Sequence, residues 1–394
     1  MTNEEIIRIT EENILSTYTR FPVAIERGEG ARLYDFGGRE YIDFASGIGV
    51  CSLGYGNELW AEAVGRQAKK LPHTSNLFYT EPAALLAREL TKRTGMAAAF
   101  FGNSGAEANE GAIKLARKYS FDKYGEGRST IVTLKNSFHG RTVTTLAATG
   151  QDVFHHYFFP FTEGFCNASA NDLESVVSAC ESGGVCAVML ELIQGEGGVL
   201  PLEKTFVAAV AEYCAANDLL LIVDEVQTGV GRTGTLFCFQ QYGIKPDVVT
   251  FAKGIAGGLP FGGFLVNAAC AGVLSAGTHA STFGGNPICS AGALAVLSTL
   301  TPAFLSEVAE KGEYLRGAIG KMNLPVVTSV RGMGLMTGVG VSVSHKQAVA
   351  ALVQNGLLAL TAGSDTVRLM PPLTITKQEI DAGLSILEKT LGGM

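Results

Sequence analysis

Strand-like apolar runs and helix-like segments alternate through the middle of this 394-residue chain. A strand that is apolar along its whole length has to be covered on both faces, as in a parallel sheet between two layers of helices. The pattern therefore predicts an α/β fold with a mainly parallel sheet. The expected strands are Thr130–Leu134, Val185–Ile193, Leu219–Val226, Asp247–Phe251 and Phe264–Val266, and Leu202–Asn217 is an expected helix between them.

The regions on either side carry further local signals. Ala31–Asp43 alternates around Gly37-Gly38, which predicts a hairpin. Apolar spacing predicts a helix over Glu81–Thr94, and the apolar run Met96–Phe101 leads into a helix over Ala106–Tyr119. After about residue 290 we expect a smaller α+β unit. Its expected helices are Ser290–Leu300, Leu305–Met322, Lys346–Asn355 and Lys377–Leu391, and its expected strands are Val326–Val330, Gly338–Val343 and Val367–Leu369.

Charge is sparse and unevenly placed. Only 17% of the residues are charged and 47% are hydrophobic, which excludes disorder as the main character of the chain. The formal net charge of −7 disfavours a nucleic-acid partner. Residues 254–306 contain no Asp, Glu, Lys or Arg, but their apolar pieces are broken and shorter than the roughly 20 residues that span a membrane. We expect this stretch to be buried against other protein or a ligand.

Two features indicate a cytoplasmic protein. The first residues, Met1–Glu12, are acidic and lack the apolar run of a signal peptide. The eight cysteines include no CxxC pair, so free thiols in a reducing compartment explain them better than disulfides or zinc. His155-His156 has no third-ligand pattern, and no metal site is expected.

A glycine-rich break, Phe101–Ala106, leaves a predicted strand and enters a helix. Free backbone N–H groups and the positive helix end would form an anion site there, to which Ser104 adds a hydroxyl. The alternative is that Asn103 or Ser104 simply caps the helix. The break matches neither GxGxxG nor the P-loop, which disfavours NAD and ATP.

Two acids, Asp224 and Glu225, end the apolar run Leu219–Val226. Ligands of open α/β sheets bind at the carboxyl ends of strands, and side-chain alternation would turn one acid into the site and the other away. The alternative is a surface acid at the start of a loop. Glu225 is expected to be the one that faces away.

A lysine, Lys253, follows the strand Asp247–Phe251 and opens the charge-free stretch. Most lysines are solvated surface groups. A desolvated amine, in contrast, loses its proton more easily and becomes a nucleophile towards aldehydes. A phosphate site, a carboxylate for a pyridinium nitrogen and an amine for an aldehyde together meet the requirements of pyridoxal phosphate.

The chain also resembles the class III aminotransferases, which are fold type I pyridoxal-phosphate enzymes, and among them most closely the N-acetylornithine aminotransferases. The resemblance covers nearly the whole chain, and ten motifs carry it in order. They are Tyr18–Pro22, Leu71–Phe78, Asn103–Asn109, Phe138–Thr142, Gln194–Gly198, Asp224–Gly229, Gly231–Gly234, Ala252–Ile255, Ser281–Pro287 and Arg368–Leu373.

The resemblance implies a division of the chain. A large pyridoxal-phosphate domain, 46–295, would contain a mainly parallel seven-stranded sheet with helices on both faces. The C-terminal part, 296–394, and the N-terminal segment, 1–45, would build a smaller α+β domain.

The resemblance also assigns the cofactor site. Lys253 would form the Schiff base with the cofactor and shuttle a proton, Asp224 would pair with the ring nitrogen, and Gln227 would lie near the phenolic oxygen. Further residues would hold the rest of the cofactor. Ser104, Gly105 and Ala106 would bind the phosphate together with Thr282 of a neighbouring subunit, Phe138 would stack on the ring beside Gly140, and Glu191 would lie next to this layer.

On the substrate side, Arg368 resembles the α-carboxylate binder and Arg141 the residue that holds the other carboxylate. Glu196 resembles a switch that neutralises an arginine when the incoming end of the substrate has no charge. Ser281 is the remaining residue expected to bind substrate. The alternative for both arginines is surface ion pairing.

Four residues depart from the family pattern. They are Tyr55, where relatives usually have His, Leu192, where many have Pro, and Gly102 and Gly263, where others often have larger residues. We expect them to loosen the wall of the site without removing a chemical group.

The predicted function is transfer of the δ-amino group of N2-acetylornithine to 2-oxoglutarate by a cytoplasmic homodimer, with no nucleic-acid or membrane partner. Other ω-aminotransferases, acting on ornithine, succinylornithine, succinyldiaminopimelate or 4-aminobutyrate, remain alternatives. An isomerase related to glutamate-semialdehyde aminomutase and a non-catalytic cofactor-binding relative are alternatives of other classes. The acyl group of the donor, the pathway and any assembly beyond a dimer stay open.

Overall fold

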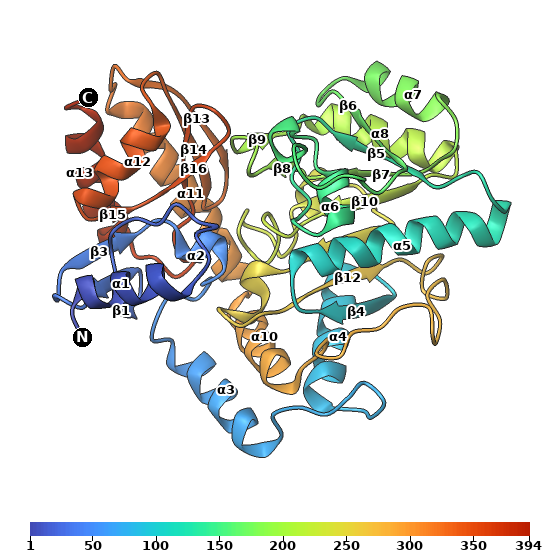
Figure 1. Ribbon diagram of the computed structural model, residues 1–394, viewed down its shortest axis with the longest axis horizontal. Helices are drawn as coiled ribbons and strands as arrows, with labels where there is room; N and C mark the ends of the chain where they lie inside the picture. The colour runs from blue at the N-terminus through green and yellow to red at the C-terminus, as the bar shows by residue number, and fades with distance from the viewer.

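The central element is a seven-stranded sheet whose strands all come from residues 98–266 (Figure 1). The computed structural model describes residues 1–394. Strands β11, β10, β7, β5 and β6 are parallel to one another, whereas β12 is antiparallel to both β11 and β4. The predicted mainly parallel α/β sheet is therefore confirmed. The strand order is β4 (Ala98–Gly102), β12 (Gly262–Val266), β11 (Val248–Phe251), β10 (Leu220–Asp224), β7 (Val185–Leu190), β5 (Thr130–Leu134) and β6 (Phe165–Ala168).

Helices cover both faces of this sheet because its strands are apolar on both sides. Leu221 and Val223 of β10 belong to the large core cluster that includes α8 (Lys204–Ala216). Leu220 and Ile222, which point the other way, belong to a second cluster with α5 (Gly105–Tyr124). Figure 1 shows α5 along one side of the sheet and α8 with α7 (Leu173–Glu181) on the other.

The C-terminal part of the chain forms a separate antiparallel sheet. Its order is β13 (Val327–Met333), β14 (Met336–Val341), β17 (Thr366–Leu369) and β16 (Leu360–Ala362). The helices of this region are α11 (Pro302–Lys321), α12 (His345–Gln354) and α13 (Lys377–Leu391). They match the helices and strands predicted from the spacing, with ends shifted by a few residues.

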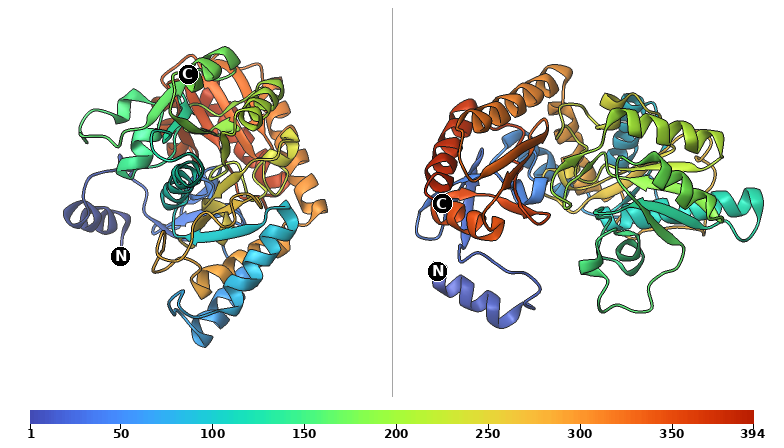
Figure 2. Two further views of the ribbon diagram at one scale, coloured as in Figure 1. Left: turned by 90° about the vertical axis from the view of Figure 1, so that its right-hand side faces the viewer. Right: turned by 90° about the horizontal axis from the view of Figure 1, so that it is seen from above.

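The N-terminal segment joins this C-terminal part. The predicted hairpin is present as β2 (Arg32–Asp35) and β3 (Glu40–Asp43), with β1 (Ile25–Glu29) beside β2. The C-terminal strand β15 (Leu357–Leu358) pairs in parallel with β3. Both termini lie at the same end of the molecule (Figure 2). This shared sheet supports the division that we propose, with 1–45 and 296–394 in a small domain and 46–295 in a large one.

The remaining helices and strands belong to none of these sheets and are not among the helices named so far. They are α1 (Asn3–Asn13), α2 (Ser46–Gly49), α3 (Glu58–Lys70), α4 (Glu81–Thr94), α6 (Val143–Ala148), α9 (Phe239–Tyr242), α10 (Pro287–Thr299), β8 (Ile193–Gln194), β9 (Leu200–Pro201) and two 3₁₀ turns at Asp152–Phe154 and Lys253–Ala256. The predicted strand Val185–Ile193 is too long, because β7 ends at Leu190 and Ile193 pairs with β9 instead.

The charge-free stretch is buried in part. Strand β12 is buried throughout, and α10 packs against α3 and α4. The connection between them, 268–283, is largely exposed in the single chain, so its burial against other protein stays a prediction. The chain has no single helix long and apolar enough to cross a membrane; α10 and α11 pass that test only as a pair, and a bend of 76° separates them.

One glycine of α11 tests the packing of the small domain. A Cβ at Gly312 would collide with the carbonyl oxygen of Gly334, whereas a Cβ at Gly317 of the same helix would meet nothing. We expect Gly312→Ala to lower the free energy of unfolding by about 1–3 kcal/mol through overpacking. Gly317→Ala should raise it by up to ~1 kcal/mol, because alanine is the better helix former.

Denaturant unfolding of the two variants measures both effects. Equal stability changes in the two proteins would contradict the close packing of α11 on the turn between β13 and β14.

Candidate active site

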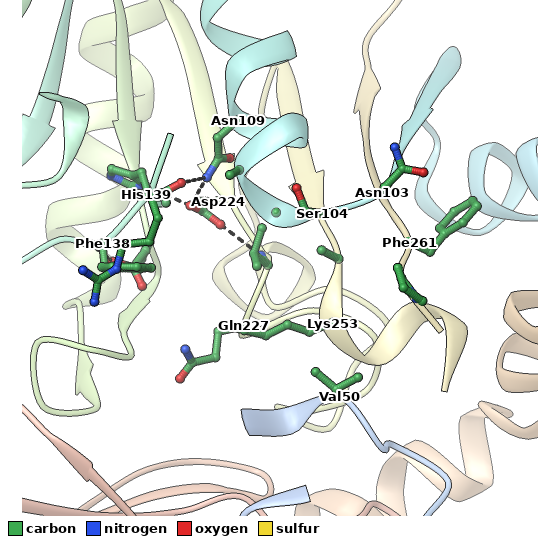
Figure 3. A pocket seen from close by; sticks show the side chains of 18 of the residues that line it. Val50, Asn103, Ser104, Asn109, Phe138, His139, Asp224, Gln227, Lys253 and Phe261 are labelled. Atoms are coloured by element: carbon green, nitrogen blue, oxygen red, sulfur yellow. Dashed lines mark hydrogen bonds and ion pairs between the residues drawn. The ribbon is translucent and has the colours of Figure 1, made fainter. Parts of the chain in front are cut away.

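A cavity of about 430 Å³ lies at the carboxyl ends of the central strands (Figure 3). Its position follows from the fold, because a strand buried on both faces can present polar groups only where it ends. Most of the residues predicted for the site line it. They are Ser104, Gly105, Ala106, Phe138, Arg141, Glu191, Asp224, Gln227 and Lys253.

The turn from β4 into α5 forms one wall. Ser104 is the N-cap of α5, and its Oγ accepts the N–H of Glu107 at 3.1 Å. The backbone N–H groups of Gly105 and Ala106 lie in the first turn, where a helix has no internal acceptors for them. A Cβ at Gly105 would lie 2.6 Å from Val226, so no larger residue fits there. The wall therefore offers backbone donors to an anion.

Asp224 is the best-held carboxylate of the cavity. It ends β10 and is only 3% exposed. Its Oδ2 accepts Asn109 Nδ2 at 2.8 Å and lies 2.8 Å from His139 Nδ1, and its Oδ1 accepts the N–H of Val226 at 3.0 Å. Figure 3 shows Asn109 and His139 converging on this carboxylate. His139 thus lies within hydrogen-bonding distance of the Asp224 carboxylate.

Glu225 faces away from the cavity, as strand alternation predicts. Its carboxylate accepts the hydroxyl of Thr228 and the N–H groups of Cys238 and Phe239.

Asn109 is the polar residue that the sequence argument missed. It is 1% exposed, and its Nδ2 donates to the His139 carbonyl at 2.7 Å as well as to Asp224. A signal was available, because Asn109 stands four residues after Gly105 and therefore on the same face of α5.

Lys253 opens a 3₁₀ turn directly after β11. Its φ of +48° is uncommon for a residue with a side chain, so the backbone holds strain here. The Nζ atom makes no hydrogen bond or ion pair within the chain. Burial lowers the pKa of Lys253 below its ordinary value. The structure thus presents an amine that loses its proton more readily than a surface lysine.

Glu191 and Phe138 lie side by side near the end of β7. The Glu191 carboxylate accepts the N–H of Phe138 at 2.8 Å and the N–H of Gly195 at 3.2 Å. Burial raises the pKa of Glu191, to about 7. The neighbouring Gly140 has φ +143°, and a Cβ there would lie 3.0 Å from Ala106.

Arg368 and Glu196 form a two-pronged ion pair just beyond the cavity. Arg368 Nη1 lies 2.6 Å from Glu196 Oε1, and Nη2 donates to Oε2 at 3.2 Å. Gln227 connects the pair to the cavity, since its Oε1 accepts from Arg368 Nη1 at 3.0 Å. Burial alone would raise the pKa of Glu196, but the Arg368 guanidinium outweighs it and lowers that pKa. Arg368 itself is 3% exposed, which excludes ordinary surface pairing.

Two further predicted residues, like Glu196 and Arg368, lie outside the cavity lining. Ser281 is linked to its edge, because its Oγ accepts Asn103 Nδ2 at 3.3 Å. Thr282 is exposed on the loop 268–283 and belongs to no wall of this chain's own cavity.

The four departures from the family pattern do not loosen the wall of the site, and that expectation is wrong. None of them lines the cavity. The Tyr55 hydroxyl donates to Asp43 at 2.8 Å, and Leu192 is packed in the main core. A Cβ at Gly263 would collide with the Phe100 carbonyl, and one at Gly102 would lie 3.3 Å from Glu107, so these glycines leave no empty space.

Comparison with known proteins agrees with this geometry. The family model "Aminotransferase class-III" matches residues 15–391. An acetylornithine aminotransferase of Haemophilus ducreyi is 50% identical, with all of both chains covered. The crystal structure of N-acetylornithine aminotransferase from Stenotrophomonas maltophilia K279a is 37% identical, with a TM-score of 0.85 and 98% of each chain covered. An ornithine aminotransferase structure from Toxoplasma gondii, described with partial occupancy of PLP at its active site, is 30% identical with a TM-score of 0.95, covering 100% of this chain and 95% of that one.

The chain belongs to the class-III aminotransferases. These enzymes depend on pyridoxal 5'-phosphate, and the residues of the cavity fit that group. Backbone donors at the start of α5 suit a phosphate, the buried Asp224 carboxylate suits a ring nitrogen, and the unpaired Lys253 amine suits an aldehyde. Gly105 and Gly140 let the walls of the cavity pack closely, because a Cβ at Gly105 would meet Val226 and one at Gly140 would meet Thr145.

The hydrogen bond from Asn109 generates a test of the site. We expect Asn109→Ala to weaken the binding of pyridoxal phosphate about tenfold or more, since a hydrogen bond to a charged group contributes roughly 1.5–3 kcal/mol. The measurement is a titration of the apoprotein followed by cofactor absorbance.

Ser120→Ala is the matched control on the same helix, because Ser120 Oγ is buried and has no hydrogen-bond partner to lose. Unchanged cofactor affinity in Asn109→Ala would show that Asp224 needs no support from α5.

Proposed function

We propose that this chain transfers the δ-amino group of N2-acetylornithine to 2-oxoglutarate, giving N-acetylglutamate 5-semialdehyde and glutamate in arginine biosynthesis. The observation that carries the proposal is the Glu196–Arg368 pair beside the cavity. One site has to accept the uncharged end of acetylornithine and the charged α-carboxylate of glutamate at the same place. An arginine whose charge can be covered or released meets that requirement. The names of the relatives support the same choice of substrate.

The cofactor site follows from the residues of the cavity. Pyridoxal phosphate, when bound, carries the amino group and acts as an electron sink. Lys253 would hold its aldehyde and move a proton on that side, and Asp224 would keep the ring nitrogen protonated. The remaining residues would position the group. Ser104, Gly105 and Ala106 would hold the phosphate, Phe138 would cover a ring face, Gln227 would lie by the phenolic oxygen and Glu191 beside this layer.

The substrate site uses two guanidinium groups. Arg368 would bind the α-carboxylate of glutamate with its planar fork, after Glu196 has moved aside. Arg141 would bind the carboxylate at the far end of either substrate. Ser281, at the cavity edge, would complete the site.

We also propose a homodimer in which Thr282 of a neighbouring subunit reaches the phosphate. The support is a surface of exposed apolar residues, Leu77, Phe78, Tyr79 and Phe283. Asn76 joins its two segments, since its Nδ2 donates to the carbonyls of Ser281 and Gly284. An uncharged, apolar surface of this kind is typical of a protein interface. The eight free cysteines favour a cytoplasmic location.

A panel of amine donors with 2-oxoglutarate tests the substrate. We expect the highest kcat/KM for N2-acetylornithine, with ornithine, succinylornithine, succinyldiaminopimelate and 4-aminobutyrate below it. A best kcat/KM on 4-aminobutyrate or ornithine would assign the chain to another ω-aminotransferase. Turnover of a substrate without any added keto acid would support the isomerase alternative instead.

The Glu196–Arg368 pair generates a second test. Glu196→Gln leaves the Arg368 charge uncovered, so we expect kcat/KM for acetylornithine to fall about tenfold or more relative to that for glutamate. Glu203→Gln, at an exposed position, is the control and should leave the ratio unchanged. Equal changes for both substrates would exclude the switch.

A further inference from the structure

Arg141 has no polar partner. It is exposed, and its guanidinium makes no hydrogen bond or ion pair within the chain. Instead, its Cζ lies 4.2 Å from the ring centre of Phe154 and 5.6 Å from that of Phe138. A guanidinium over an aromatic face is attracted by the ring quadrupole and stacks on it. The two rings therefore hold a side chain that would otherwise move freely in solvent.

Phe154 is itself fixed by contacts with Phe138 and, through His155, with α6. The residue ends the 3₁₀ turn Asp152–Phe154, and its ring meets the edge of Phe138 at 5.7 Å with an interplanar angle of 69°. The next residue, His155, donates from Nε2 to the carbonyl of Leu146 at 2.9 Å. Leu146 lies in α6. Thr142 is the N-cap of this helix and follows Arg141 directly.

Two more hydrogen bonds fix this segment. Gln151 Nε2 donates to the carbonyl of Ser137 at 3.0 Å, and Thr162 Oγ1 lies 3.2 Å from Thr144 Oγ1 of α6. The segment 151–162 is thus attached to α6, which follows Arg141, and to Ser137, which precedes Phe138. The position of Phe154 relative to Arg141 is set by this local framework.

We propose that Phe154 is a positioning residue for Arg141 and, through it, a determinant of binding of the carboxylate at the far end of the substrate. The inference rests on the proposed function, because it takes Arg141 as the binder of that carboxylate. An aromatic face orients the guanidinium without using any of its N–H donors, so all of them stay free for the substrate. A carboxylate in the place of Phe154 would compete with the substrate for the same donors.

The contrast with Arg368 supports the proposal. Arg368 is held by Glu196, a partner that must leave before a substrate carboxylate can bind. Arg141 must bind a carboxylate in both half-reactions and needs no such switch. Stacking on Phe154 keeps it available at all times.

Steady-state kinetics of the holoenzyme test this role with two donors. One is N2-acetylornithine, and the other is N-acetyl-1,4-diaminobutane, which is the same molecule without its carboxylate. We expect Phe154→Leu to lower kcat/KM for acetylornithine about fivefold, mainly through KM. The loss for N-acetyl-1,4-diaminobutane should stay below about twofold. Phe154→Tyr, which keeps an aromatic face, should restore the wild-type values.

Two further variants separate positioning from folding. Phe158→Leu alters an exposed ring of the same loop and should leave kcat/KM unchanged for both donors. In an Arg141→Ala background, Phe154→Leu should cause no additional loss, because there is no guanidinium left to position. Single-turnover absorbance changes make slow variants measurable.

Each outcome has one meaning. Equal loss on both donors, or an additive loss in the Arg141→Ala background, would overturn the role of Phe154. A wild-type enzyme that does not transaminate acetylornithine would instead overturn the proposed function. If the wild type does not turn over N-acetyl-1,4-diaminobutane, the double-mutant comparison decides the question.

Discussion

The central sheet is buried on both faces, and this constraint determines where the rest of the molecule can carry polar chemistry. Leu220–Val223 contribute apolar side chains to both helical layers, so the first position on β10 that can hold a carboxylate is its end, Asp224. The same holds for Lys253 after β11 and for Glu191 after β7. Parallel strands bring these ends to one edge, and the cavity forms there.

Burial at this edge has an electrostatic consequence. Ionisable groups are removed from water, so each needs a partner or shifts its pKa. Asp224 has three donors around it, Glu196 has Arg368, and Lys253, without any partner, has a lowered pKa. Arg141 differs from these groups because it is exposed at the side of the cavity. Two aromatic rings hold its guanidinium, and its N–H donors stay free. The site thus combines groups with tightly held charge and groups that are ready to react.

Local patterns predicted much of this arrangement. Alternation along β10 separated Asp224 from Glu225, and the uncharged surroundings of Lys253 indicated its desolvation. The departures from the family pattern misjudged Leu192, which follows Glu191 in sequence but turns into the core. They also misjudged Gly263, whose missing side chain makes room for a neighbouring strand and not for a substrate. Adjacency in sequence does not tell which way a side chain points once regular alternation ends.

Periodicity and motifs are local properties of the chain, and they were enough to predict the parallel sheet, the class of chemistry and most of the predicted site residues that line the cavity. Which groups meet across the fold became visible only in three dimensions. Arg368 and Glu196 are separated by 172 positions, and Asn109 and Asp224 by 115. The same packing sets the stacking of Arg141 on Phe154 and the exposure of the loop 268–283 in the single chain. Such contacts depend on how separate elements pack, and no periodicity along the chain encodes them.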